Sequence, residues 1–270
     1  MIKALKSLAT DHKGEVAIAW KHLKTGQNWS INADKPMPTA SLCKFPIMIE
    51  TYRQAAEKKV SLDKMITLKA EDKVPGSGIL TADFSAGSTL ALRDAVRLMI
   101  KFSDNTATNL VLDVIGLDST AKYMASLGCP NTWVHSKVYK RETSIAPERS
   151  KQFGLGSTSA DEMIRLLELL HQKKLVSPEA STEMYAQLLT CDDKNKFPRF
   201  LPYGTKIAFK TGSVNASRTA AGIIDTKSGP VALCVMTDKN EDQSWGPENA
   251  GDLVCSHAAK ILFDRFDRKD

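Results

Sequence analysis

Residues 39–50 read TASLCKFPIMIE, which places Ser41 and Lys44 immediately before an apolar run with helical spacing. Residues three positions apart lie on the same face of a helix, so we expect the Ser41 hydroxyl and the Lys44 amine within hydrogen-bond distance. A serine hydroxyl is a weak nucleophile until a base removes its proton, and a partly desolvated lysine can serve as that base. The stretch therefore predicts a nucleophile and its base at the start of an apolar helix.

Two other residues of this stretch bear on the same helix. Pro46 lacks a backbone N–H, and proline inside a helix clashes with the carbonyl four residues earlier, so we expect a local distortion there. Cys43 points away from the face that Ser41 and Lys44 share, by helical spacing, and we interpret it as a packing residue.

The S-x-x-K pattern occurs twice more, at 61–64 and 119–122. Ser61 lies in the polar connection KKVSLDK, without an apolar helix behind it. Ser119 begins a helical segment, where we expect it to cap the helix. The first copy, at 41–44, is therefore the candidate with a catalytic setting.

Two further motifs follow in the chain. Ser103-Asp104-Asn105 lies within LMIKFSDNTATNLVLD (98–113), where Ser103 can relay a proton and Asn105 can orient a substrate amide. K-T-G occurs at 24–26, which we interpret as a hairpin turn, and at 210–212, where it ends the strand KIAF. A lysine and a hydroxyl on an edge strand can hold a carboxylate, so the second K-T-G is the candidate binding element.

The order of the predicted elements indicates one sheet assembled from both ends of the chain. Periodicity and turn residues predict a helix at 2–12, a β-hairpin over 14–32, mostly helices from 45 to 188, strands at 205–212, 218–225 and 230–238, and a helix at 248–266. We therefore predict a single catalytic domain, 1–270, with a sheet lobe from about 1–40 and 190–270 and a helical lobe of about 41–189. A cleft is expected between the lobes.

Composition excludes several other classes of protein. With 270 residues, 42% hydrophobic and 25% charged, the chain is neither disordered, fibrous nor a disulfide mini-protein, and no apolar run reaches the roughly 18 residues that span a bilayer. The net charge of +6 weakly favours anionic ligands and does not predict nucleic-acid binding. Five cysteines without metal-ligand spacing indicate free or buried thiols and no metal site.

S-x-x-K, then SDN, then KTG, in this order, is the signature of class A β-lactamases and penicillin-binding proteins, and the chain resembles the class A β-lactamase-type serine hydrolases over nearly its whole length. The likeness extends to PGSGIL (75–80), to the surroundings of SDN and to GSTSADEMIRLL (156–167). The resemblance implies an α/β (α+β) fold, in which a five-stranded antiparallel sheet flanked by helices joins an all-helical lobe.

The resemblance also assigns roles to the matched residues. It implies that Ser41 is the acyl-forming nucleophile, Lys44 its base, and Ser103 the group that passes the proton to the β-lactam nitrogen. Asn105 would contact the substrate side chain, and Lys210 with Thr211 would hold the substrate carboxylate.

Two further assignments concern the end of the K-T-G strand. The backbone N–H groups of Ser41 and Ser213 would form the oxyanion hole. Arg218 lies near the place where many such enzymes keep a carboxylate-binding arginine, and an exposed strand arginine is the equal alternative.

The resemblance weakens at residues 140–146, KRETSIA, where class A enzymes show R-x-E-x-x-L-N. In those enzymes the glutamate and the asparagine hold the water that hydrolyses the acyl-enzyme. Glu142 is at the glutamate position, but Lys140 and Ala146 replace the arginine and the asparagine. Glu142 is therefore either the deacylation base or a solvated charge, and Glu148 is a weaker candidate for the base.

Three functions follow from these residues. The leading hypothesis is a serine β-lactam hydrolase of modest turnover that needs no cofactor. The alternative is a penicillin-binding-type D-Ala-D-Ala peptidase or amidase, and the remote alternative is a β-lactam-binding sensor domain. We expect a monomer that acts on a small molecule, with no nucleic-acid partner and no membrane segment. No signal peptide is visible, and the family resemblance implies a periplasmic or secreted protein.

Overall fold

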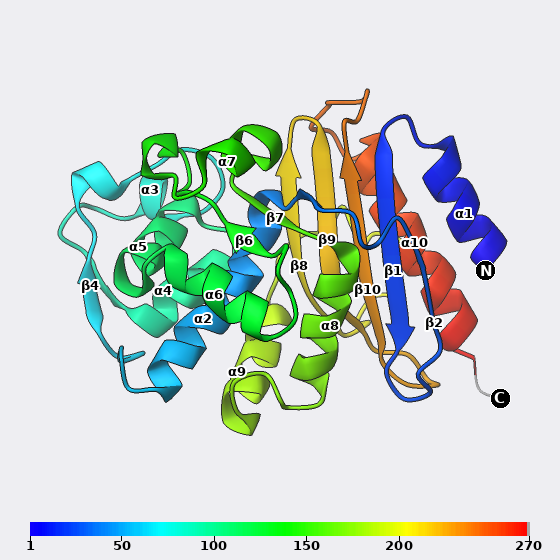
Figure 1. Cartoon of the computed structure of the whole chain (residues 1–270), viewed down its shortest axis with the longest axis horizontal. Helices are drawn as coiled ribbons and strands as arrows, with labels where there is room; N and C mark the ends of the chain where they lie inside the picture. Colours follow the sequence, from blue (N-terminus) through cyan, green and yellow to red (C-terminus); the bar gives the residue numbers. More distant parts are fainter. Residues whose placement is uncertain (269–270) are drawn as a thin grey trace.

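The computed structural model describes residues 1–268 and joins a sheet with its covering helices to a second, mainly helical part (Figure 1). The five-stranded antiparallel sheet has the order β2-β1-β10-β9-β8. Its strands are β1 (Glu15–His22), β2 (Asn28–Ile31), β8 (Ile207–Val214), β9 (Ser217–Ile224) and β10 (Val231–Asp238). The predicted sheet built from both ends of the chain is confirmed.

Strand β1 shows why the sheet is covered on both faces. Val16, Ile18 and Trp20 belong to the hydrophobic cluster shared with α1 (Ile2–Asp11) and α10 (Ala250–Phe266). Ala17 and Ala19 belong to the cluster on the opposite side of the sheet. Successive side chains of a strand point to opposite faces, so the alternating sequence seals two layers at once.

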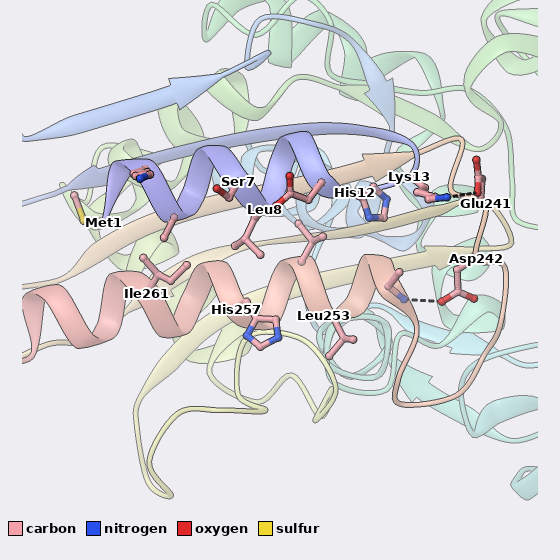
Figure 2. A pocket seen from close by; sticks show the side chains of 15 residues that line it. Met1, Ser7, Leu8, His12, Lys13, Glu241, Asp242, Leu253, His257 and Ile261 are labelled. Carbon is pink, nitrogen blue, oxygen red and sulfur yellow. Dashed lines mark hydrogen bonds and ion pairs between the residues drawn. The ribbon is translucent and has the colours of Figure 1, made fainter.

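The outer face of the sheet carries α1 and α10 side by side, so the two ends of the chain lie together (Figure 1). A mainly apolar groove of about 1180 Å³ runs between these two helices. Figure 2 shows Leu8 of α1 and Leu253 and Ile261 of α10 lining it. None of the motif residues lies in this groove.

The remaining elements form the helical part and the connections. They are α2 (Lys44–Ala56), α3 (Leu80–Asp83), α4 (Leu92–Lys101), α5 (Asn105–Ile115), α6 (Asp118–Ser126), α7 (Pro147–Phe153), α8 (Ala160–His171) and α9 (Pro178–Leu188). Short strands pair as β3 (Met37–Pro38), β7 (Gly156–Thr158) and β6 (Trp133–Val134), and as β4 (Met65–Thr67) with β5 (Thr89–Ala91). The sequence pattern did not predict these short strands. No helix among residues 1–268 is long and apolar enough to cross a membrane.

Helix α8 packs on β10 and β1, although it lies within the 41–189 segment predicted as the helical lobe. It begins after Ser159, whose hydroxyl caps it by accepting from the Glu162 N–H. The sheet is thus flanked by helices on both faces. The division into a sheet lobe of about 1–40 and 190–270 and a helical lobe of about 41–189 stays a prediction.

Helix α2 accommodates Pro46 without the expected distortion. A 3-10 turn, Ala40–Cys43, precedes the helix, which begins at Lys44, so Pro46 is its third residue. The first four N–H groups of a helix have no partner within it, and a proline there loses no hydrogen bond. Cys43 is buried, as are the other four cysteines, and all five are free thiols.

Ser119 is not the cap that its position predicted. Helix α6 begins at Asp118, and the Ser119 hydroxyl donates back to the carbonyls of Ile115 and Gly116. The third S-x-x-K is therefore structural, and its Lys122 forms a surface ion pair with Asp118.

Candidate active site

The 3-10 turn that carries Ser41 lies against the edge strand β8, where sheet and helical part meet. Gly212 permits this approach, because a Cβ atom at that position would lie 2.7 Å from the Ser41 nitrogen and 2.6 Å from the Thr219 hydroxyl. The Thr219 hydroxyl in turn donates to the Thr39 carbonyl at 2.9 Å. The glycine of the second K-T-G therefore allows Ser41 to lie this close to the strand.

Lys44 is fully buried and surrounded by the first two motifs. Its Nζ lies 3.1 Å from the Ser41 Oγ, 2.6 Å from the Ser103 carbonyl oxygen, 3.1 Å from the Ser103 Oγ and 2.8 Å from the Asn105 Oδ1. Burial, together with the nearby Lys210 ammonium, lowers the pKa of Lys44 to about 7. A neutral amine is therefore accessible near neutral pH.

The neutral amine fits this set of neighbours. It has two N–H bonds, which suit the Ser103 carbonyl and the Asn105 amide oxygen, the two closest acceptors. Its lone pair is then left for the Ser41 hydroxyl. The geometry is that of a general base next to a serine nucleophile.

Ser103 joins the two lysines. Its Oγ lies 3.1 Å from the Lys44 Nζ and 3.2 Å from the Lys210 Nζ. Its backbone has φ of 53°, a left-handed conformation that is uncommon for a residue with a side chain. The Ser77 hydroxyl donates to the Ser103 carbonyl at 2.7 Å and supports this turn.

Asp104 holds the loop that carries Gly76 and Ser77. It caps α5 by accepting from the Ala107 N–H, and its other oxygen accepts from the N–H groups of Ile79 and Leu80 at 2.7 and 2.9 Å. The middle residue of SDN thus fixes the segment PGSGIL against the motif.

Lys210 and Thr211 are both buried in β8. The Lys210 Nζ donates to the Thr211 carbonyl at 2.8 Å as well as to the Ser103 Oγ. Burial lowers the pKa of Lys210, while the Asp193 carboxylate nearby opposes that shift. By contrast, Lys24 of the first K-T-G follows β1 at the turn, where Gly26 has φ of 77°, which confirms the hairpin.

Residues of the S-x-x-K, SDN and second K-T-G motifs border a cavity of about 610 Å³. Its lining comes from the Ser41 turn, from the Gly76–Ser77 loop, from Ser103 and Asn105, from β8 and from the segment 136–141. Ser41, Ser103, Asn105, Thr211 and Ser213 contribute to the lining, and Lys44 and Lys210 contact it through Ser103. The cavity is smaller than the groove between α1 and α10, yet it holds all three motifs.

Arg218 lies outside this cavity lining. It is 1% exposed, so it is not the exposed strand arginine that the sequence allowed. Its guanidinium donates to the Ser217 carbonyl at 3.0 Å and to the Ser244 carbonyl at 2.6 Å, and it lies 3.5 Å from Asp252. The guanidinium also lies over the ring of Trp245, 4.9 Å from its centre, and Trp245 lines the cavity.

Glu142 is also outside the lining. It lies in the 3-10 turn Arg141–Thr143, and its side chain is exposed. Glu148 points outward as well, in a surface ion pair with Lys151. Among residues 1–268 the only carboxylate that lines the cavity is Asp193, which accepts from the N–H groups of Asn195 and Lys196.

Lys196 is a site residue that the sequence analysis missed. It is 2% exposed, and its Nζ contacts Asp193 at 3.3 Å, Asp252 at 3.1 Å and the Ser213 Oγ at 2.9 Å. Because an ammonium group only donates, Ser213 accepts from Lys196, and its own hydroxyl proton is free to point elsewhere. Lys196 lies in the polar run CDDKNK, which carries no signal that distinguishes it from a surface lysine.

Known proteins of one family are similar to this chain over most of its length. The model of the beta-lactamase enzyme family matches residues 1–266. The chain is 21% identical to beta-lactamase VEB-1 of Pseudomonas aeruginosa, over 87% of this chain and 80% of the relative. It is 23% identical to an imipenem-hydrolyzing beta-lactamase of Enterobacter cloacae, over 98% of this chain and 89% of the relative.

Solved structures give the same result. The crystal structure of a beta-lactamase from Sphaerobacter thermophilus has a TM-score of 0.86 and 28% identity, covering 98% of this chain and 96% of that one. The structure of PBP-A has a TM-score of 0.84 and 22% identity, covering 98% and 95%, and shows likeness of fold alone. The chain therefore belongs to the beta-lactamase enzyme family, as a class A-like serine hydrolase that acts on β-lactams.

Proposed function

We propose that this enzyme is acylated efficiently by β-lactams at Ser41 and releases the acyl group slowly, so that its turnover is modest. The observation that carries the proposal is the contrast within one cavity. A lysine with a lowered pKa lies 3.1 Å from the Ser41 Oγ, whereas Glu142, at the position expected for the deacylation base, is exposed and outside the lining.

The acylation step follows from the contacts. The neutral Lys44 amine takes the Ser41 hydroxyl proton as the Ser41 Oγ attacks the lactam carbonyl carbon. The backbone N–H groups of Ser41 and Ser213 stabilise the oxyanion, while Lys210 and Thr211 hold the substrate carboxylate. The C–N bond then breaks, and the Ser103 hydroxyl gives its proton to the lactam nitrogen and regains one from Lys44, so the protons balance.

Deacylation requires a water activated by a base on the other face of the acyl carbonyl. Among residues 1–268, the one carboxylate that lines the cavity and could act as this base is Asp193. Burial alone would raise its pKa, but the Lys196 ammonium and backbone N–H groups outweigh burial and lower the pKa. A carboxylate in such an ion pair is a weak base. We therefore propose that Glu142 is a solvated charge and that water attacks slowly.

The test is pre-steady-state kinetics with a chromogenic cephalosporin, together with intact mass. We expect a burst of one product per enzyme, a slow steady state and an adduct on Ser41. Ser41→Ala should remove burst and adduct, and the matched control Ser61→Ala, in the exposed S-x-x-K, should keep both. An adduct on the Ser41→Ala protein, or a fast steady state without a burst, would contradict the proposal.

A second candidate is a D-Ala-D-Ala peptidase or amidase, and the exposed position of Glu142 favours it because such an enzyme needs no dedicated hydrolytic glutamate. It would use the same Ser41, Lys44, Ser103 and Lys210 set. Release of D-alanine from a diacyl-lysyl-D-Ala-D-Ala peptide measures this activity. Release that depends on Ser41 and exceeds β-lactam turnover would make the peptidase the main function.

We also propose that the enzyme works as a monomer on a small molecule, in the periplasm or outside the cell. Every residue of the acylation mechanism comes from one chain, which supports the proposal of a monomer. Membership of the family supports the proposed location. Size-exclusion chromatography and cell fractionation test the two parts separately.

A further inference from the structure

The cavity at Ser41 is bordered by more positive than negative charge. Lys137 and Arg141 line it from the segment 136–141, and the buried Lys210 lies behind Ser103. Against these stands Asp193, whose carboxylate is already paired with Lys196. A cleft lined by one sign of charge raises the local concentration of ligands of the opposite sign.

The two cations of the segment 136–141 that line the cavity, Lys137 and Arg141, differ in whether a carboxylate already pairs with them. The Lys137 ammonium is ion-paired with Asp113 of α5. Arg141 is exposed, and no carboxylate within residues 1–268 forms an ion pair with it. A guanidinium presents a planar set of donors that matches a carboxylate, so Arg141 is the group that can bind an anion from the cavity.

The position of this segment indicates which part of a substrate reaches Arg141. A Cβ atom at Gly76 would lie 2.7 Å from the Asn105 Nδ2 and 3.1 Å from the Tyr139 hydroxyl, so Tyr139 and Asn105 border the same loop. Asn109 of α5 fixes the segment by bonding both the N–H and the carbonyl of Val138, at 2.8 and 3.0 Å. The segment thus lies next to Asn105 at the Gly76 loop, and Thr211 of β8 lines the same cavity.

On these grounds we propose that the enzyme prefers acyl donors with a second anionic group on the acyl side chain, and that Arg141 binds this group. The inference rests on the proposed function, in which Lys210 and Thr211 take the first carboxylate and Asn105 faces the side chain. Arg141 is then a specificity-determining residue, because it contacts the substrate without taking part in bond making.

Benzylpenicillin and carbenicillin are the matched probes, because they differ by one carboxylate on the acyl side chain. The measurement is the second-order rate constant for acylation of the full-length enzyme, followed by intact mass. In the wild type we expect carbenicillin to react several-fold faster than benzylpenicillin. Arg141→Gln should lower the carbenicillin constant roughly fivefold, the size of one partly exposed charge contact, and leave benzylpenicillin within about twofold.

Two controls separate recognition from structure. Arg141→Lys keeps the charge and should retain more of the carbenicillin preference than Arg141→Gln does. Lys140→Gln removes the neighbouring charge, which is outside the lining and whose Nζ bonds the Glu71 carbonyl, and should change neither constant. In 0.5 M salt the preference of the wild type should shrink, because salt screens exposed charges.

The results distinguish failure of this inference from failure of the proposed function. If benzylpenicillin does not acylate Ser41 in the wild type, the proposed function is wrong. If benzylpenicillin acylates Ser41 and Arg141→Gln leaves the ratio of the two constants unchanged, or Lys140→Gln lowers it equally, the inference is overturned.

Discussion

The region around Lys44 and the loop 140–146 border the same cavity but differ in how firmly their polar groups are held. Lys44 is fully buried, and its amine has four polar atoms within 3.1 Å, all from the S-x-x-K and SDN motifs. Glu142 is exposed at the surface of a short 3-10 turn. Under the proposed function, this difference means that the fold positions the groups for acylation of the serine and no comparable base for release of the acyl group. Four predictions test this contrast.

The largest effect is expected at Lys44. Lys44→Met removes the base while keeping a long apolar chain, and the loss of general base catalysis should lower the acylation rate constant by about 10³-fold. The measurement is the rate of adduct formation with penicillin by intact mass. Lys122→Met, in the S-x-x-K of α6, is the matched control and should react at the wild-type rate. Equal rates for the two variants would refute the assignment of the base.

A smaller loss is expected at Lys210. Removal of its fixed charge by Lys210→Ala should lower kcat/KM by about 10²-fold, or about 2.7 kcal/mol of transition-state stabilisation. The corresponding change at Lys24, in the K-T-G of the β1–β2 turn, should leave activity within about twofold. Steady-state kinetics of both variants measure the two values of kcat/KM. Equal losses of kcat/KM would show that the second K-T-G is not the carboxylate-binding element.

The pH dependence of acylation follows from the pKa of Lys44, which burial and Lys210 lower to about 7. Only the neutral amine accepts the Ser41 proton. The acylation rate constant should therefore be constant well above pH 7 and fall about tenfold per pH unit well below it. Stopped-flow acylation between pH 5 and 9 gives the profile. A rate that is flat through this range would show that Lys44 is not the titrating base.

No effect is expected at Glu142. Because its side chain is exposed and outside the cavity lining, Glu142→Ala should acylate at the wild-type rate and deacylate within about twofold of it. Burst and steady-state phases measured on both proteins provide the comparison. Accumulation of acyl-enzyme in Glu142→Ala alone would establish Glu142 as the base, and the contrast between the two regions would disappear.

The sequence predicted the elements whose residues carry a local pattern. The alternation of Val16, Ile18 and Trp20 predicted β1, and the family resemblance that the motifs carry implied one site with Ser41, Ser103 and Lys210. The sequence could not predict that Lys196 is buried, because its burial depends on ion pairs with two aspartates. Asp252 is distant in the sequence, and Asp193 lies in a polar run that resembles a surface loop.

The errors have local physical causes. Pro46 was expected to distort a helix, but the preceding 3-10 turn places it among the first helical residues, where no N–H is needed. Ser119 was expected to be a cap, but its hydroxyl bonds the carbonyls of the preceding turn from inside α6. In both cases the property of the residue type was interpreted correctly, but the residue at which the helix begins was predicted wrongly.

The burial of Lys44 also has a consequence for the stability of the fold. In the unfolded chain this amine holds its proton up to its ordinary pKa of 10.5, whereas in the folded protein it loses the proton above about 7. Between these values the unfolded state binds more protons, so this one residue makes the folded state less stable by about 1.4 kcal/mol for each pH unit of acidification, down to about pH 7. Lys44, the base of the proposed acylation step, therefore weakens the native state most at and below neutral pH, and the rest of the fold has to offset that loss of stability.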